Sequence, residues 1–597
     1  MENEIDDFYM EPYDCNDPAN EPRPDNVVYT ASFRELQALN KKAASLLRDP
    51  LENSTFQNGI TKGLVKEIIK RTKDDFPDQV KFAIVGDMSA GEHVHRSRCK
   101  NDADRLTGKS SLLNSILSIG TIARKVGCSQ PMICTSADKN KGDGGDSCTW
   151  VVQRYQKMFP EQSSPFAAKV RFFNRDEIRN TLGDLLAKYY RAANKEVKDE
   201  EDCDGENEDY TRVESYGDMR DTITAFTALF CEHVEFATEE AAHFFLKQAK
   251  SENDRRILNT LVEWADSLVE EYLGEKTALL IENSTPDRLL WDLQPFTYQI
   301  GGPEGQGLVA PWPLVSAIDF GLEHPLLNEG IVFVDSPGLS DTNSSRSKNA
   351  ILSHRECTHK IIVAEIGRAE AAEAVRKNLQ AGSRTRGSSN MLLVLTRGDS
   401  IDPKTDVSRT PIEKKRLDRL DIEIEQLQTQ KKQKQQERRR AKAEDRDDLA
   451  EEIQSISLDI RKLSAEMESC RLEMRNRKVV IKMQEMYKGL TSDPKQLATF
   501  AVGNQAYQQH AAGFSDDDRP HISVKQTNIP ALRHKLYMMP IQGRLNDTMH
   551  LAETQLPNLV STMELYCAQL HLAQKSIWRK KARSKPWSWL QRNCFPL

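Results

Sequence analysis

Two segments of the sequence together have the composition of a loop that binds the phosphates of a nucleoside triphosphate. Residues 86–91 read G-D-M-S-A-G, and residues 108–111 read G-K-S-S. In such a loop, consecutive backbone N–H groups surround the β-phosphate, a lysine supplies positive charge, and a hydroxyl group binds Mg²⁺. The residues expected to hold the phosphates are Gly86, Asp87, Gly91, Gly108, Lys109, Ser110 and Ser111.

Residues 92–107 separate the two segments and would interrupt the loop. Removing this stretch and merging the two glycines that flank it gives the complete pattern G-x-x-x-x-G-K-S. A relaxed version of the pattern also exists at 103–110, but no strand directly precedes it, and Asp102 and Asp104 would bring carboxylates near the phosphates. We therefore prefer the split loop, and we hypothesise that residues 92–107 are translated intron.

Asp335 and Gly338 have the spacing of a second phosphate-sensing motif. They follow the apolar run 331–334 and belong to the sequence D-S-P-G-L. An aspartate at the end of a strand can hold Mg²⁺ through water, and the N–H of the glycine can reach the γ-phosphate. The motif alone is often an ordinary turn, but its position after a buried strand and downstream of a phosphate loop favours the functional interpretation.

Thr396, Arg397 and Asp399 follow another apolar run, residues 391–395, and have the spacing of a base-recognition motif. A carboxylate can accept the N1 and N2 hydrogens of guanine, and adenine lacks this pair of donors. Asp399 is therefore predicted to select guanine. Arg397 replaces the lysine usual in T-K-x-D, and its guanidinium could cover the face of the base; the alternative is a polar turn.

Thr149 is the candidate for a mobile hydroxyl that closes over the γ-phosphate. It comes just before a strand-like run that begins at Trp150. With Ser110 and Asp335 it would form the set of magnesium ligands. The alternative is a threonine at the edge of a strand, with no role in binding.

Apolar runs and helical repeats place these motifs in an α/β fold. Strands are expected at 80–85, 169–173, 317–321, 330–334, 391–395 and 499–502. Helices are expected at 32–69, at 110–117 and over most of 212–281. Strands that alternate with helices indicate a phosphate-loop domain with a mostly parallel sheet flanked by helices.

Residues 412–490 interrupt this alternation with an apolar repeat spaced by three and four residues. Its positions are Leu449, Ile453, Ile456, Ile460, Leu463, Met467, Cys470 and Met474, preceded upstream by Leu417, Leu420, Ile424 and Leu427. Such spacing predicts a coiled coil, here a helical hairpin inserted before the last strand. Two interpretations remain open: a solvated spacer, and a surface for self-association or for a protein partner.

Composition excludes several classes of protein. The chain has 597 residues and a net charge of −7, which argues against bulk nucleic-acid binding as its main role, and no feature indicates specific binding of nucleic acid. Its 11 cysteines include no C-x-x-C pair, which indicates a reduced, intracellular protein, cytoplasmic or nuclear, without a zinc module. No apolar run approaches the ~20 residues that cross a bilayer, so we expect at most a peripheral membrane contact.

Taken in order, the motifs resemble those of the dynamin superfamily of large GTPases. The joined phosphate loop, residues 335–339 and residues 396–399 are similar to its three nucleotide motifs, and residues 357–376 resemble its next strand and helix. The similarity is greatest to large fungal dynamin-type GTPases and to the nuclear GTPase SLIP-GC group. It implies Mg²⁺-dependent hydrolysis of GTP to GDP and phosphate, with Lys109, Ser89 and Thr149 as the catalytic residues.

The resemblance also implies a domain organisation. We expect a disordered acidic tail at 1–28, a dynamin-type GTPase domain at 29–410 with a helical insert at about 210–281, a coiled-coil hairpin at 411–490, a closing segment at 491–545, and a helical, truncated C-terminal segment at 546–597.

One residue departs from the family pattern. Met88 occupies the position where dynamins have the glutamine that orients the attacking water, and a methionine side chain is a poor hydrogen-bonding group. The alternative function is therefore a catalytically impaired coiled-coil scaffold that carries a degenerate nucleotide-binding fold.

Overall fold

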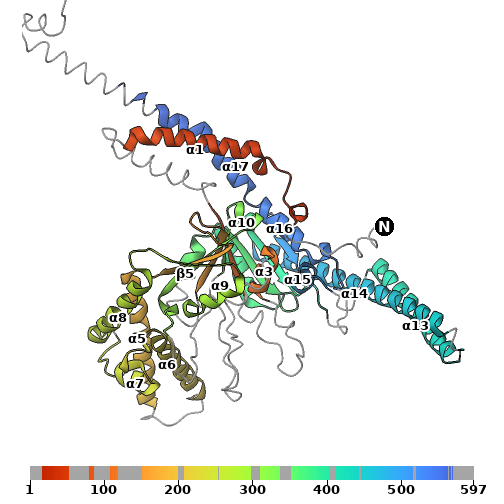
Figure 1. Cartoon of the computed structure of the whole chain (residues 1–597), viewed down its shortest axis with the longest axis horizontal. Helices are drawn as coiled ribbons and strands as arrows, with labels where there is room; N and C mark the ends of the chain where they lie inside the picture. The colour runs from red at the N-terminus through yellow and green to blue at the C-terminus, as the bar shows by residue number, and fades with distance from the viewer. Residues whose placement is uncertain are drawn as a thin grey trace, which may run out of the picture. The chain divides into compact units, whose positions relative to one another are not determined.

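A nine-stranded mixed sheet forms the centre of the part of the chain that the structure describes (Figure 1). The computed structural model describes residues 17–52, 79–86, 108–118, 151–199, 208–252, 254–297, 309–335, 351–401, 410–440, 442, 446–514, 520–561, 564–565 and 568. The strands are β1 (Val80–Gly86), β2 (Val152–Lys157), β3 (Phe166–Phe172), β4 (Leu279–Asn283), β5 (Val315–Leu322), β6 (Ile331–Asp335), β7 (His359–Glu365), β8 (Met391–Thr396) and β9 (Ala498–Ala501).

The strand order β4-β3-β5-β2-β6-β1-β7-β8-β9 divides the sheet into two halves. From β6 to β9 all neighbouring strands are parallel. In the other half β2 pairs with β5 in parallel, whereas the pairs β2–β6, β3–β5 and β3–β4 are antiparallel. The α/β class is confirmed, and the parallel half contains the ends of all the strands on which the predicted motifs lie.

The central parts of the parallel strands β1, β6, β7 and β8 are continuously apolar, as expected when helices cover both faces of a sheet. Every residue of β6 and β8 is buried. Strand β4 was not expected, since residues 212–281 were predicted to be mostly helical. Its half-exposed sequence L-L-I-E-N has no clear period, and only its pairing with β3 makes it a strand.

The described helices are α1 (Ala31–Glu52), α3 (Lys109–Leu117), α5 (Arg175–Asp199), α6 (Glu208–Phe230), α7 (Glu239–Leu246), α8 (Arg255–Leu273), α9 (Pro286–Asp292), α10 (Pro325–Asn328), α12 (Glu373–Thr385), α13 (Pro411–Arg440), α14 (Arg446–Leu490), α15 (Asn504–Ala512), α16 (Ile529–Met538) and α17 (Ile541–His550). A π-helical turn, Leu551–Gln555, follows α17.

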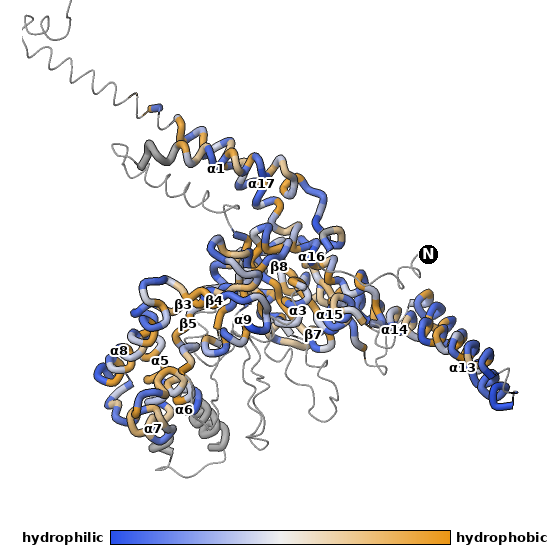
Figure 2. The backbone as a smooth tube through the Cα atoms, in the orientation of Figure 1, coloured by the Kyte–Doolittle hydropathy of each residue, from blue (hydrophilic) through white to orange (hydrophobic). Residues whose placement is uncertain are grey.

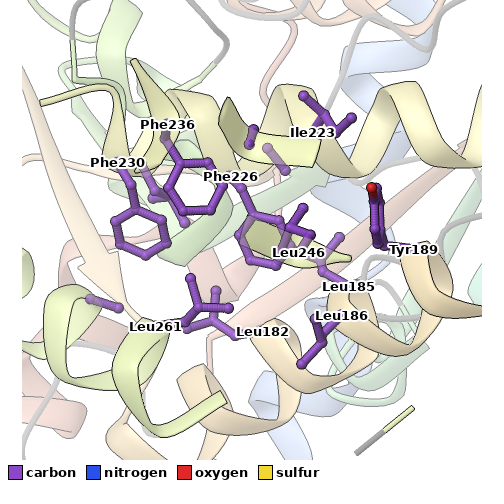
Figure 3. Close-up of a cluster of buried hydrophobic side chains, with 14 of the residues drawn as sticks. Leu182, Leu185, Leu186, Tyr189, Ile223, Phe226, Phe230, Phe236, Leu246 and Leu261 are labelled. Carbon is purple, nitrogen blue, oxygen red and sulfur yellow. The ribbon is translucent and has the colours of Figure 1, made fainter. Parts of the chain in front are cut away.

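Helices α5 to α8 share a hydrophobic core of their own (Figure 3). Phe226, Phe230 and Phe236 pack there with Leu182 and Leu261, and all five side chains are almost fully buried. The helical region thus begins with α5 directly after β3, earlier than the expected 210. Its aromatic residues explain how these helices form a packed body beside the sheet.

Helices α13 and α14 lie side by side as an antiparallel pair (Figure 1), and their distal ends are strongly hydrophilic (Figure 2). Leu417 of α13 packs against Cys470 and Met474 of α14, and these three side chains are buried. Toward the distal end, Ile453 and Ile456 are only partly buried. The part of the predicted seam at Cys470 and Met474 therefore faces α13, and burial decreases toward Ile453; the coiled coil as a whole stays a prediction.

The chain divides into two compact units: Met1–Pro22 with Val80–Arg533, and Arg23–Gln79 with His534–Leu597. In the second unit the hydroxyl of Tyr29 donates to the carbonyl oxygen of Tyr537 at 2.5 Å, and Gln37 donates to Thr548 at 3.5 Å. Residues 29–52 therefore belong with the C-terminal helices, and the boundary falls within α16. This grouping differs from the expected bounds at 29 and at 545/546, and the expected domain bounds stay predictions.

Two further expectations concern the tail and membranes. The expected disordered tail spans 1–28, but within it Glu21 forms an ion pair with the buried Arg533, so residues 17–22 have a defined position in the first unit. Among the described helices, none combines the length and the apolar character needed to span a bilayer.

Candidate functional site

The end of β1 and the start of α3 meet in space although residues 87–107 separate them in sequence. Strand β1 ends at Gly86, and α3 begins at Lys109 with Gly108 as its N-cap. A Cβ atom at Gly86 would lie 3.0 Å from the carbonyl oxygen of Val363 and 3.4 Å from Cγ of Lys109. Only glycine fits here without displacing backbone, as expected for a loop that approaches a phosphate closely.

Lys109 lies beside Asp335, the last residue of the neighbouring strand β6. Its Nζ atom is 3.4 Å from Oδ1 of Asp335, whose side chain is 2% exposed. This Oδ1 atom has no hydrogen-bond partner of good geometry among the described residues. The two predicted phosphate motifs are thus adjacent, with a buried carboxylate oxygen that retains acceptor capacity for a further ligand.

The first turn of α3 adds donors and hydroxyl groups to the same place. Ser110 is partly exposed, whereas Ser111 is buried and its hydroxyl has no hydrogen-bond partner among the described residues. The helix N-terminus carries a partial positive charge and N–H groups that no carbonyl of the helix accepts. Together with Lys109, this arrangement suits an anion such as a phosphate chain.

The negative charge of Asp335 also affects the pKa of Tyr155 on the neighbouring strand β2. Tyr155 is fully buried and donates its hydroxyl hydrogen to Oε1 of Gln153 at 2.6 Å. Burial, and next the negative charge of Asp335, raise the pKa of Tyr155 well above its ordinary value. The carboxylate therefore faces uncharged groups on this side, and Lys109 is the cation beside it.

The base-recognition motif lies at the end of β8, two strands away from β1. Thr396 is fully buried within the sheet. Arg397 has the positive φ angle of 61°, and its guanidinium forms an ion pair with Glu365 at 3.0 Å. The arginine expected to cover a base therefore has a carboxylate partner at the end of β7, which fixes its position next to the site.

Asp399 is held at the N-terminus of α15. Its Oδ2 atom accepts the N–H of Ala506 at 2.9 Å, which ties the motif at the end of β8 to the helix after β9. Burial raises the pKa of Asp399, and the hydrogen bond from Ala506 opposes this effect. A carboxylate has about four acceptor positions, and the hydrogen bond from Ala506 occupies one of them.

Helices α3 and α15 connect the phosphate end with the base end. The side-chain amide of Gln508 donates to the hydroxyl of Ser115 at 3.3 Å, and that hydroxyl donates to the carbonyl oxygen of Ser111 at 3.0 Å. Asn504, at the start of α15, is buried, and its side-chain amide has no hydrogen-bond partner among the described residues. The sequence predicts only that Asn504 belongs to the closing segment. Its burial at the start of the helix that contacts Asp399 is a finding of the structure.

Two residues of α14 also contact the site and were not predicted. Arg475 donates to the carbonyl oxygens of Arg397 and Ser400, and Asn476 donates to that of Gly398. In the sequence both directly follow Met474, the last residue of the apolar repeat, in the expected hairpin, where polar residues are expected to face solvent. No local signal distinguishes them from the other polar residues of α14.

Several predicted site residues lie outside the described part of the chain: Asp87, Ser89, Gly91, Thr149 and Gly338, together with Met88 and residues 92–107. Their roles stay predictions.

The described residues around Lys109 suit a magnesium ion bound together with a nucleotide better than a metal ion held by protein side chains alone. Among the described residues, no group of three His, Cys, Asp or Glu side chains is arranged to hold a metal ion. Magnesium, however, is usually bound by one or two protein oxygens together with phosphate oxygens and water. The oxygens of Ser110 and Asp335 beside Lys109 meet that requirement.

No known protein family matches the sequence, and no curated protein matches it. Solved structures with a likeness to the chain include two of an oligomerised bacterial dynamin pair, described as a mechanism for long-range sensing and tethering of membranes. The first is 11% identical with a TM-score of 0.35, and the alignment covers 92% of this chain and 50% of the other. The second is 14% identical with a TM-score of 0.34, and the alignment covers 94% and 62%.

The chain thus spans between half and two thirds of the length of these two structures. Both come from a bacterial pair, so the finer resemblance to fungal dynamin-type and SLIP-GC proteins stays a prediction.

Proposed function

We propose that this chain binds GTP with Mg²⁺ across the carboxyl ends of β6, β1 and β8, as dynamin-type GTPases do. The observation that carries the proposal is the common edge of the sheet at which Asp335, Lys109 and Asp399 lie. Ligands of open α/β sheets bind at the carboxyl ends of parallel strands. A phosphate-binding end and a carboxylate for guanine at one such edge match the two ends of a single nucleotide.

Each residue has a defined part in this proposal. Lys109 and the N-terminus of α3 neutralise the charge of the β- and γ-phosphates, and Ser110 and Asp335 hold Mg²⁺, which supplies further positive charge. Asp399 accepts hydrogen bonds from guanine. Hydrolysis to GDP and phosphate would depend mainly on positioning and electrostatics, so it requires an intact phosphate loop.

Titration with fluorescent GTP in the presence of Mg²⁺ tests the proposal. We expect Lys109→Ala to weaken binding at least about tenfold, because the lysine contributes charge-assisted hydrogen bonds. Lys81→Ala is the matched control: Lys81 lies at the opposite end of β1, where it pairs with Glu356 at 3.1 Å. Equal affinities of the parent and the Lys109 variant would contradict the proposal, as would equal competition by ATP and GTP.

A scaffold without turnover is the second candidate, and the 45-residue helix α14 favours it. In that case the chain would bind GTP without releasing phosphate. Measuring phosphate release by a chain that binds GTP separates the two candidates.

A further inference from the structure

Helix α14 belongs to two parts of the molecule. Its first half pairs with α13, whereas its last turns are part of the core of the nucleotide-binding domain. There Met483 and Tyr487, 0% and 1% exposed, pack with Leu393 and Leu395 of β8. One continuous helix therefore runs from the hairpin to the strand that carries the base-recognition motif.

At the junction between these two halves, α14 donates three hydrogen bonds to the loop after β8. An Nη2 hydrogen of Arg475 reaches the carbonyl oxygens of Arg397 at 3.0 Å and Ser400 at 2.8 Å. The side-chain amide of Asn476 donates to the carbonyl oxygen of Gly398 at 2.9 Å. Nε of Arg475 donates to Oδ1 of Asn476 at 2.8 Å, so the two side chains also fix each other.

These hydrogen bonds hold a loop that has a costly backbone conformation. Arg397 has a φ of 61°, a conformation that is costly for a residue with a side chain. A Cβ atom at Gly398 would lie 2.9 Å from the carbonyl carbon and oxygen of Val502, so the loop also passes very close to the end of β9. The loop follows the last residue of β8, so its carbonyl oxygens lie outside the hydrogen bonds of the sheet. Helix α14 supplies donors for three of them.

A second set of contacts leads from α14 to Asp399. Leu472 packs with Ala506 and Ile522, and the N–H of Ala506 is the one that Asp399 accepts. The charge of Arg475 also acts on that carboxylate. Burial lowers the pKa of Arg475 to about 10, and the negative charge of Asp399 opposes this shift. Burial raises the pKa of Asp399, and the positive charge of Arg475 is among the effects that oppose that rise.

We propose that Arg475 and Asn476 are positioning residues for guanine recognition: they hold the loop 397–400 so that Asp399 faces the base, and they couple the hairpin to nucleotide affinity. The inference rests on the proposed binding of GTP. A movement of α14 at this junction would change the position of the base-reading carboxylate, whereas the phosphate end, formed by β1, α3 and β6, has no such contact with Arg475 or Asn476 among the described residues.

The experiment compares two probes that occupy different parts of the site. Fluorescent GTP requires both ends, whereas inorganic tripolyphosphate requires only the phosphate end. The variants are Arg475→Ala and Asn476→Asp; the second keeps the shape of the side chain and replaces its donor with an acceptor that repels the Gly398 carbonyl. Arg477→Ala is the matched control, because Arg477 lies on the same helix turn and pairs with Glu413 of α13 at 3.0 Å.

We expect both variants to weaken GTP about tenfold, the loss typical of hydrogen bonds from a charged or buried donor, and to leave tripolyphosphate and the melting temperature unchanged. Arg477→Ala should behave like the parent. Unchanged GTP affinity in both variants overturns the inference. An equal loss of GTP and tripolyphosphate also overturns it, because that result indicates general damage to the domain.

All measurements are made in the full chain and in a shortened chain that lacks residues 92–107, with Gly91 and Gly108 merged into one glycine. If neither parent chain binds GTP, the proposed function itself fails and the inference fails with it. If a parent chain binds GTP and the Arg475 and Asn476 variants bind equally well, only the inference fails.

Discussion

Asp399 makes a structural hydrogen bond and is also the residue predicted to recognise guanine. Its Oδ2 atom accepts the N–H of Ala506 and so fixes the start of α15, while the same carboxylate is the candidate for binding guanine. The two interpretations drawn from the sequence, a base reader and a polar turn, are therefore compatible. A group with a structural bond on one side and a ligand on the other is held in one orientation, which favours selectivity.

The substitution Asp399→Asn tests the role in base selection. The amide oxygen of asparagine can keep the bond from Ala506, and its NH₂ group would then face the base. We expect GTP to bind at least about tenfold more weakly and xanthosine triphosphate to bind more tightly, because xanthine has an acceptor where guanine has its amino donor. Competition titrations measure both nucleotides, and an unchanged preference for GTP would show that Asp399 is only a helix cap.

His359, at the start of β7, makes stability depend on pH. It is 7% exposed and its ring stacks on Phe82 with 4.7 Å between centroids. Burial, and next the positive charge of Arg386, lower its pKa from 6.5 to about 4. The folded chain therefore holds this histidine neutral at a pH where the unfolded chain protonates it.

This contribution of His359 is present above pH 6.5 and is lost as the pH falls through about 4. His324 and His354 have pKa values lowered to about 3 and about 4, so they act in the same direction. The free energy of unfolding of the parent falls between pH 7 and pH 4. We expect this fall to be smaller in His359→Phe, by up to about 3 kcal/mol. Urea unfolding at both pH values measures it, and an equal pH dependence in parent and variant would refute the prediction.

At the scale of elements, the hairpin is the part most open to association. Leu417, Cys470 and Met474 fill the seam near the sheet, whereas Ile456 and Ile460 toward the distal end are only partly buried. The structure shows α13 and α14 packed on each other. Whether a second copy of the chain adds to this seam stays a prediction.

Charged substitutions in the distal seam test that prediction. We expect Ile456→Lys together with Ile460→Lys to lower helicity or to dissociate an oligomer, because each places a charge against apolar side chains. Leu458→Lys is the control, since Leu458 is 51% exposed on the outer face of α14. Circular dichroism measures the helicity, and sedimentation measures the oligomeric state. If both are unchanged, the seam has no role in assembly.

At the scale of the whole molecule, we expect the interruption of the phosphate loop to decide whether the proposed site binds GTP. The end of β1 and the start of α3 already lie together, with Gly86 beside the side chain of Lys109. The two described segments that flank residues 87–107 are therefore close together in the structure. A phosphate loop nevertheless needs N–H groups on consecutive residues, and the extra residues separate them.

We expect the shortened chain described above to bind GTP with Mg²⁺ dependence and the full chain to bind it poorly. Sequencing the mature transcripts tests the origin of the stretch as intron. If every transcript retains these codons and the full chain binds GTP as tightly as the shortened one, the hypothesis is wrong.

The sequence alone determined the strands of the parallel half and the motifs at their ends. Apolar runs such as 331–334 and 391–395 are buried on both faces, so their composition is continuous and recognisable, and a polar motif directly after such a run must lie at the edge of the sheet. For this reason the sequence predicts that Asp335 and Asp399 lie at the same edge of the sheet, and the parallel pairing of β6, β1, β7 and β8 agrees with this.

Only the tertiary structure decided which distant residues support that site. Arg475 and Asn476 lie about eighty residues after the loop that they contact, and nothing in their local pattern separates them from the solvated face of a coiled coil. Strand β4 and the grouping of α1 with α17 depend on partners that are even farther away in sequence. Local propensity and periodicity describe how a segment folds, whereas the choice of partner comes from packing across the whole chain.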